Sequence, residues 1–100
     1  QFQSNHISTS YLSEYSTKKT IGDAFHDFFG NPKWKSYEQG IQKYVDFQGD
    51  CTLNQEPVVA VITFSVSGDK FKVESVKVDN EPLNPLEVDS LFKTIFSEKQ

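Results

Sequence analysis

The segment Thr20–Trp34 constrains the fold most, because it contains a complete short helix with its start and stop signals. Thr20 is a suitable N-cap, and Asp23 sets a carboxylate at the positive end of the helix. Gly30 suits a left-handed C-cap, and Pro32 prevents continuation. The segment therefore predicts a helix with one core-facing side, since its apolar residues recur at the helical period as Ile21, Ala24, Phe25 and Phe28.

A second helix is predicted near the C-terminus. The run Asn84–Glu87 combines an N-cap, a proline at the first helical position and a carboxylate three residues after the cap. Leaving the phenylalanines of the two helices in water would forfeit about 1.5–3 kcal/mol each. We therefore expect both helices to cover the same face of a sheet. The apolar stripe of the second helix consists of Val88, Leu91, Phe92, Ile95 and Phe96.

Three strands are predicted between the helices, because apolar and polar residues alternate there. The first runs through residues 45–53. The second, Val58–Val66, is apolar on both faces in its first half, which is typical of a central strand. The third, Phe71–Val78, returns after a hairpin turn.

Two irregularities interrupt this alternation. Gly49 stands at an apolar position, which indicates a bulge or a site crossed by a large ring. In the third strand the apolar parity changes between Val73 and Val76. A bulge near Glu74 or Ser75 would restore the alternation.

The element order α-β-β-β-α predicts an α+β two-layer sandwich, with an antiparallel three-stranded sheet and both helices on one face. We interpret residues 36–40 as a polar turn, residues 1–16 as a linker or tether arm, and residues 17–100 as a single domain. Within the arm, Ile7–Tyr11 alternates weakly, so a fourth edge strand is an alternative.

Composition and charge exclude several classes of function. With ten lysines, no arginine and a net charge of −4, the chain lacks the basic footprint of a nucleic-acid binder, and we expect no such partner. The single cysteine, Cys51, excludes an internal disulfide and a cysteine-based zinc site. No apolar run is long enough for a transmembrane helix, so we expect membrane association only through an upstream anchor. The absence of methionine leads us to expect a processed product or an excised domain.

The string Lys19–Trp34 resembles the opening of a domain of unknown function from exported proteins and lipoproteins of low-GC Gram-positive bacteria. That opening reads approximately Thr-Ile/Val-Gly-Glu-Ala-Phe-Asp-x-Phe-Phe-x-x-Pro-x-Trp. Val45–Thr52 and Val78–Pro82 resemble later segments of the same family. The resemblance implies an extracytoplasmic location, at the cell surface or membrane-anchored, with Gln1 in the tether; it implies no activity.

The acidic residues and His26 offer candidates for a metal site and for an enzymatic site. Asp23, His26 and Asp27 share one helix face, but no fourth ligand is indicated, so we interpret them as a solvated face and expect no metal and no cofactor. Asp46 with Asp50, or with Glu38 nearby, could form the carboxylate pair of a small glycoside hydrolase. Because no catalytic triad or paired-acid geometry is evident, we expect no catalytic residues, and the hydrolase stays an alternative.

The best candidate for ligand binding is an aromatic group, Trp34, Tyr37 and Tyr44, with Lys35 beside it. If exposed, such a group could bind a sugar ring, a peptide or an anionic wall polymer. The competing interpretation is that Trp34 closes one end of the core while the tyrosines cover its rim. We therefore expect a non-enzymatic module that binds a protein, peptide or cell-wall component. A structural spacer is a further alternative, and a homo-oligomer could form through a sheet edge.

Overall fold

The computed structural model describes residues 10, 15, 19–53, 55–67 and 70–96. Its five strands form one antiparallel sheet in the order β1-β2-β3-β4-β5, so strands that are neighbours in sequence are also neighbours in space. Within these residues the fold is α+β, with two helices flanking the sheet. The elements are α2 (Ile21–Phe28), β1 (Gly30–Gln39), β2 (Gln42–Leu53), β3 (Glu56–Ser67), β4 (Lys70–Val78), β5 (Glu81–Pro82) and α3 (Pro85–Ile95).

The prediction of three strands was wrong: most of residues 36–40, interpreted as a polar turn, belong to β1, and β5 was not predicted. β1 includes most of the predicted polar turn at residues 36–40 and pairs with β2 along its length. As an edge strand it keeps most side chains exposed, and Trp34 is the large apolar residue that it turns toward the core. Its sequence therefore lacks the alternation by which strands are predicted. β5 has two residues, too few for any pattern.

Helix α2 begins as predicted and ends differently. The Thr20 hydroxyl accepts a hydrogen bond from the backbone N–H of Asp23 at 3.1 Å. The expected left-handed cap at Gly30 was wrong: Phe29 leaves the helix in an extended conformation, and the left-handed residue is Asn31, with φ of 52°. The chain therefore passes from α2 into β1 without a reversing turn.

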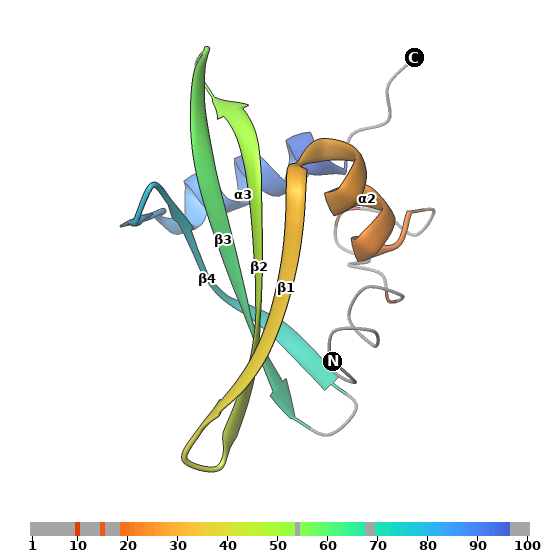
Figure 1. The fold of residues 1–100 in the computed structure, drawn as a ribbon, viewed down its shortest axis with the longest axis vertical. Coiled ribbons are helices and arrows are strands. Elements are labelled where there is room, and N and C mark those ends of the chain that lie inside the picture. The colour runs from red at the N-terminus through yellow and green to blue at the C-terminus, as the bar shows by residue number, and fades with distance from the viewer. Residues whose placement is uncertain (1–9, 11–14, 16–18, 54, 68–69, 97–100) are drawn as a thin grey trace.

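Helix α3 has the predicted start. The Asn84 side chain accepts from the Glu87 N–H at 2.8 Å, and the Glu87 carboxylate accepts from the Asn84 N–H at 2.9 Å, which completes a capping box. The rings of Phe25 in α2 and Phe92 in α3 lie 6.4 Å apart within one core cluster. Both helices thus contribute to the same core. Figure 1 shows α3 crossing behind the strands and α2 beside the start of β1.

Both predicted irregularities of the sheet are resolved. The register of β2 with β3 is unbroken at Gly49, where an added Cβ would lie 2.6 Å from Cβ of Phe29. Gly49 is therefore a site crossed by a ring, which was one of the two predicted alternatives. In β4, Ser75 pairs with Thr63 while Val73 pairs with Phe64, so Glu74 is the bulged residue, as predicted.

The predicted arm at residues 1–16 is described only at Ser10 and Tyr15. The Ser10 carbonyl accepts from the N–H of Ile21 at 2.8 Å. The Tyr15 ring lies 5.5 Å from that of Phe92. Apart from Ser10, the suggested edge strand at residues 7–11 lies outside the described residues. None of the described helices is long and apolar enough to span a bilayer.

Candidate functional site

The sheet separates the four predicted site residues between its two faces. Side chains that are opposite in the register point to the same face, and successive ones alternate. Trp34 is opposite Phe47, on the helix-covered face, which we call the inner face. Lys35, Tyr37 and Tyr44 have the opposite parity and lie on the outer face, which neither described helix covers.

Trp34 belongs to the edge of the core. Its ring stacks on that of Phe25 at 6.1 Å and meets that of Phe47 edge-on at 4.9 Å. Its Nε1–H donates to Nε2 of His26 at 3.1 Å, so that imidazole nitrogen carries no proton in this arrangement. These contacts favour the interpretation that Trp34 closes one end of the core.

The two tyrosines form a stacked pair on the outer face. Tyr37 and Tyr44 are opposite each other in the register, with ring centroids 5.5 Å apart and planes at 26°. The Tyr37 hydroxyl donates to Oδ1 of Asp46 at 3.2 Å, and the Thr63 hydroxyl donates to the same oxygen at 2.8 Å. Burial, followed by the Asp46 carboxylate, raises the pKa of Tyr37. The phenol therefore stays protonated as a donor, and Asp46 is fixed from both sides.

The register places outer-face residues in rows that cross the strands. A hollow of about 600 Å³ lies over the rows that begin at Lys33 and Lys35, and it is lined by residues of β1, β2 and β3. Its lining residues are Lys33, Trp34, Lys35, Asp46, Gln48 and Val61, all of which except Trp34 have outer-face parity. The rows are Lys33-Gln48-Val61-Lys77, Lys35-Asp46-Thr63-Ser75 and Tyr37-Tyr44-Ser65-Lys72.

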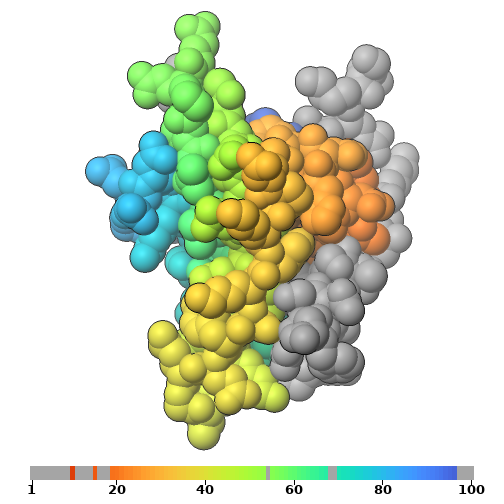
Figure 2. Space-filling model, in the orientation of Figure 1, coloured from red at the N-terminus to blue at the C-terminus, as the bar shows by residue number. Residues whose placement is uncertain are grey.

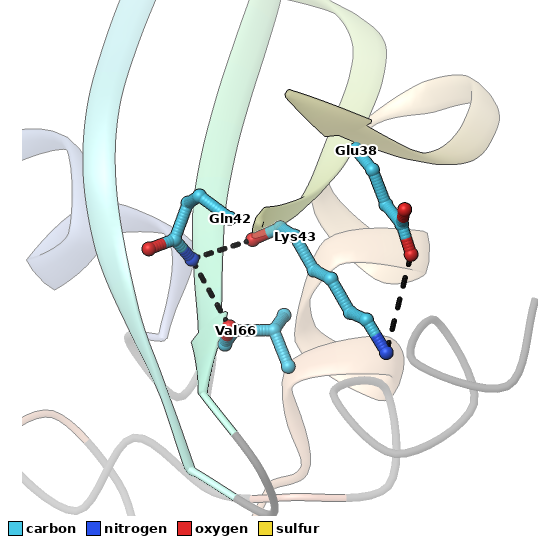
Figure 3. Close-up of polar contacts among 4 residues, drawn as sticks. All are labelled: Glu38, Gln42, Lys43 and Val66. Carbon is cyan, nitrogen blue, oxygen red and sulfur yellow. Dashed lines mark hydrogen bonds and ion pairs between the residues drawn. The ribbon is translucent and has the colours of Figure 1, made fainter. Parts of the chain in front are cut away.

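The turn end of the β1–β2 hairpin carries a separate group of polar contacts (Figure 3). Lys43 Nζ lies 4.0 Å from Oε2 of Glu38, across the hairpin. Gln42 Nε2 donates to the carbonyl oxygens of Lys43 and Val66 at 3.0 and 3.1 Å. Lys43 is opposite Val66, whose side chain is buried on the inner face, so this lysine does not belong to the outer face. Figure 2 shows the hairpin (yellow) projecting from the body of the protein.

The other chemically interesting residues are engaged elsewhere. On α2, Asp27 pairs with Lys19 at 3.0 Å, and among the described residues no group of three or more His, Cys, Asp or Glu side chains is placed to hold a metal ion. Asp50 accepts from the Asn31 amide at 2.9 Å. Burial, with smaller effects from the carboxylates of Asp50 and Asp79, raises the pKa of the Cys51 thiol. That thiol is therefore a poor nucleophile at neutral pH.

A second hollow, of about 560 Å³, lies between α3 and the ends of the neighbouring strands. Its lining is mostly apolar, with two glutamates at the margin, one of which belongs to the capping box of α3. In this hollow the Glu87 carboxylate is engaged by the capping box and the Thr94 hydroxyl by the Ser90 carbonyl, so these polar groups serve to hold α3. Its lining residues are Leu53, Glu56, Val58, Val78, Leu83, Glu87, Ser90, Leu91 and Thr94.

Sequence reasoning missed the contribution of Thr63 and treated Asp46 only as half of a carboxylate pair. Both positions follow from the pairing of β2 with β3, which places Thr63 opposite Asp46. In the predicted strand Val58–Val66, the alternation places Val61 and Thr63 on the face opposite the core, which was the available signal for Thr63. If the segment of β1 had been predicted as a strand, its alternation would also have placed Lys33, Lys35 and Tyr37 on the outer face.

Comparisons of the chain with family models, with curated proteins and with solved structures find no match. The resemblance drawn from Lys19–Trp34 therefore stays a prediction.

Proposed function

We propose that this domain is a non-enzymatic binding module of an extracytoplasmic, membrane-anchored or lipidated bacterial protein, and that the outer face of the sheet binds its protein, peptide or cell-wall partner. The observation that carries the proposal is the arrangement of Tyr37, Asp46 and Thr63 on a face that neither described helix covers. Side chains fixed before a ligand arrives lose less entropy on binding, so a positioned surface array favours recognition.

The chemistry of this face also supports binding. The stacked Tyr37–Tyr44 pair offers broad ring surface, and tyrosine is among the residues enriched where proteins bind partners. Asp46 uses one carboxylate oxygen for the two hydroxyl groups, and its second oxygen can accept from a ligand. Rings beside a fixed acceptor and flexible lysines suit a partner that has both apolar and polar groups. The extracytoplasmic location rests on the family resemblance.

The test is co-sedimentation with cell envelopes, meaning walls with their membranes and proteins, isolated from a low-GC Gram-positive bacterium. We expect the full chain to sediment with envelopes, and Tyr44→Ala and Asp46→Ala to weaken binding about tenfold or more, equivalent to at least about 1.4 kcal/mol.

The matched control is Leu86→Ala, which removes an exposed apolar side chain at the start of α3, away from the outer face. Circular dichroism would establish that each variant is folded. Equal binding by the three variants and the wild type would overturn the proposal, and so would a wild-type chain that does not sediment.

A further inference from the structure

The charge of the outer face differs in sign from that of the whole chain. The chain carries a net charge of −4. On the outer face, five lysines stand against Asp46, Asp50 and the bulged Glu74 in the strand register, and against Asp79, which is bonded to Val59 just after β4. A positive face on an acidic protein raises the local concentration of anions. The five lysines are Lys33, Lys35, Lys70, Lys72 and Lys77.

These five lysines also differ in their partners. Within the described part of the chain, none of the five forms an ion pair, although acidic residues outnumber lysines overall. The remaining described lysines all do: Lys19 with Asp27, Lys43 with Glu38 and Lys93 with Asp89 (Figure 3 shows the second pair). The unpaired positive charges are thus concentrated on one face, and their mutual repulsion would be relieved by an anionic partner.

The lysines lie on the first and the fourth strands of that face. One row of the register begins at Lys33 in β1 and ends at Lys77 in β4, with Gln48 and Val61 between them. Three strand spacings of about 4.8 Å separate its ends by roughly 14 Å. A single phosphate or carboxylate is too small to reach both Lys33 and Lys77. A chain with repeated anionic groups can contact both.

We infer that the outer face binds a linear polyanion, a polymer with phosphate or carboxylate groups repeated along its chain. Lysines of β1 and β4 contact the anionic groups, and the Tyr37–Tyr44 pair packs against the polymer backbone between them. The inference rests on the proposed function, whose ligand class it names. It does not extend to nucleic acid, because the chain has no arginine to provide bidentate contacts to bases and phosphates.

The test is a calorimetric titration of the full chain with four probes: linear polyphosphate, polygalacturonate, neutral dextran and vesicles that contain anionic lipid. We expect binding to polyphosphate, polygalacturonate or both, and none to dextran. If four lysines make contact, raising the salt from about 50 to about 200 mM should weaken binding about fiftyfold, since each contact releases about 0.7 of a counterion.

Charge-matched variants distinguish a local surface from general attraction. Lys33→Gln with Lys77→Gln removes both ends of one row, whereas Lys43→Gln with Lys93→Gln removes the same charge outside the outer face. A plot of the logarithm of the binding constant against the logarithm of the salt concentration gives a slope that counts the contacts. We expect Lys33→Gln with Lys77→Gln to reduce the magnitude of this slope by about 1.4, and Lys43→Gln with Lys93→Gln to leave it unchanged.

Two results would overturn the inference: no binding to either polymer, whether or not the vesicles bind, or equal losses in the two double variants. If envelope binding is lost in Tyr44→Ala while both polyanions fail to bind, the proposed function stands and only this inference falls. If neither envelopes nor polyanions bind the chain, both fall.

Discussion

On the inner face of the sheet, Val45, Phe47 and Phe64 are fully buried, whereas Asp46, which lies between the first two in sequence, is partly exposed on the outer face. The same strands therefore supply a packed core and a polar surface. The buried neighbours fix the backbone on either side of Asp46, and its hydrogen bonds to Tyr37 and Thr63 fix its side chain. A set of surface side chains can therefore be held rigidly when the residues between them in sequence are buried in the core.

The largest effect should come from the inner face, at Phe25. This ring of α2 is fully buried and meets the rings of Phe92 in α3 and Phe47 in the sheet. Phe25→Ala should lower the free energy of unfolding by about 3–5 kcal/mol, measured by urea denaturation. In a domain whose total is about 5–15 kcal/mol, that is a large share. Val61→Ala, on the outer face, should lower the free energy of unfolding far less. Equal losses in the two variants would show that the inner face does not hold the core of the fold.

A smaller inner-face effect is expected at Gly49, because an added Cβ would lie 2.6 Å from Cβ and 2.8 Å from Cγ of Phe29. Gly49→Ala should lower the free energy of unfolding by about 1–3 kcal/mol through overpacking. Gly30→Ala is the matched control, since its nearest neighbours would lie at 4.0 Å. If thermal denaturation gave the two variants the same stability, Phe29 would not lie tightly over Gly49.

On the outer face we expect a modest stability effect with a clear pH signature. Tyr37→Phe removes one hydrogen bond to Asp46 and should cost about 0.5–1.5 kcal/mol. Because the folded pKa of Tyr37 is raised, the folded state holds its proton after the unfolded state has lost it. Stability should therefore fall as the pH rises above about 10.

Asp46→Asn sharpens this test of the outer face. It removes the carboxylate, so the pKa of Tyr37 should fall toward its ordinary value while staying somewhat raised by burial. Ultraviolet titration of tyrosinate, with Tyr37→Phe to assign the signal, measures the change. A pKa of Tyr37 that does not respond to Asp46→Asn would contradict the network.

The smallest effect is expected where Tyr15 meets α3. Asp89 accepts from the Tyr15 hydroxyl at 2.9 Å and pairs with Lys93 at 3.1 Å. Hydrogen bonding from Lys93, then from Tyr15, lowers the pKa of Asp89. Its contribution to stability is present above the unfolded pKa of about 4 and is lost as the pH falls through the folded value.

The pH dependence of urea denaturation tests this contact. Between pH 7 and acid, wild-type chain should lose slightly more stability than Asp89→Asn, and Tyr15→Phe should fall between them. An unchanged acid profile in Asp89→Asn would show that the hydrogen bond from Tyr15 and the ion pair with Lys93 do not stabilise the fold through the Asp89 carboxylate.

Much of the fold follows from local pattern. The caps at Thr20 and Asn84, the ring-crossed Gly49 and the bulge at Glu74 each have a signal within a few residues, and the structure agrees with them. β1 has no such signal, because an edge strand with exposed side chains is defined by its pairing with β2 rather than by its own pattern.

The candidate site was predictable in part. Tyr37, Tyr44 and Lys35 were grouped by proximity in sequence, and the register places all three on one face. Trp34 was grouped with them, but strand parity turns it toward the core. Thr63 joins the site through the pairing of β2 with β3, a long-range contact that no local pattern encodes.

Amide chemical-shift mapping of the full chain during titration with linear polyphosphate or polygalacturonate tests directly whether the outer face is the binding surface. The largest shifts should fall in β1 at residues 33–37 and in β4 at residues 70–77, and α2 and α3 should hardly change. Shifts centred on α3 and the hollow beside it, or no shifts with either polymer, would contradict this expectation.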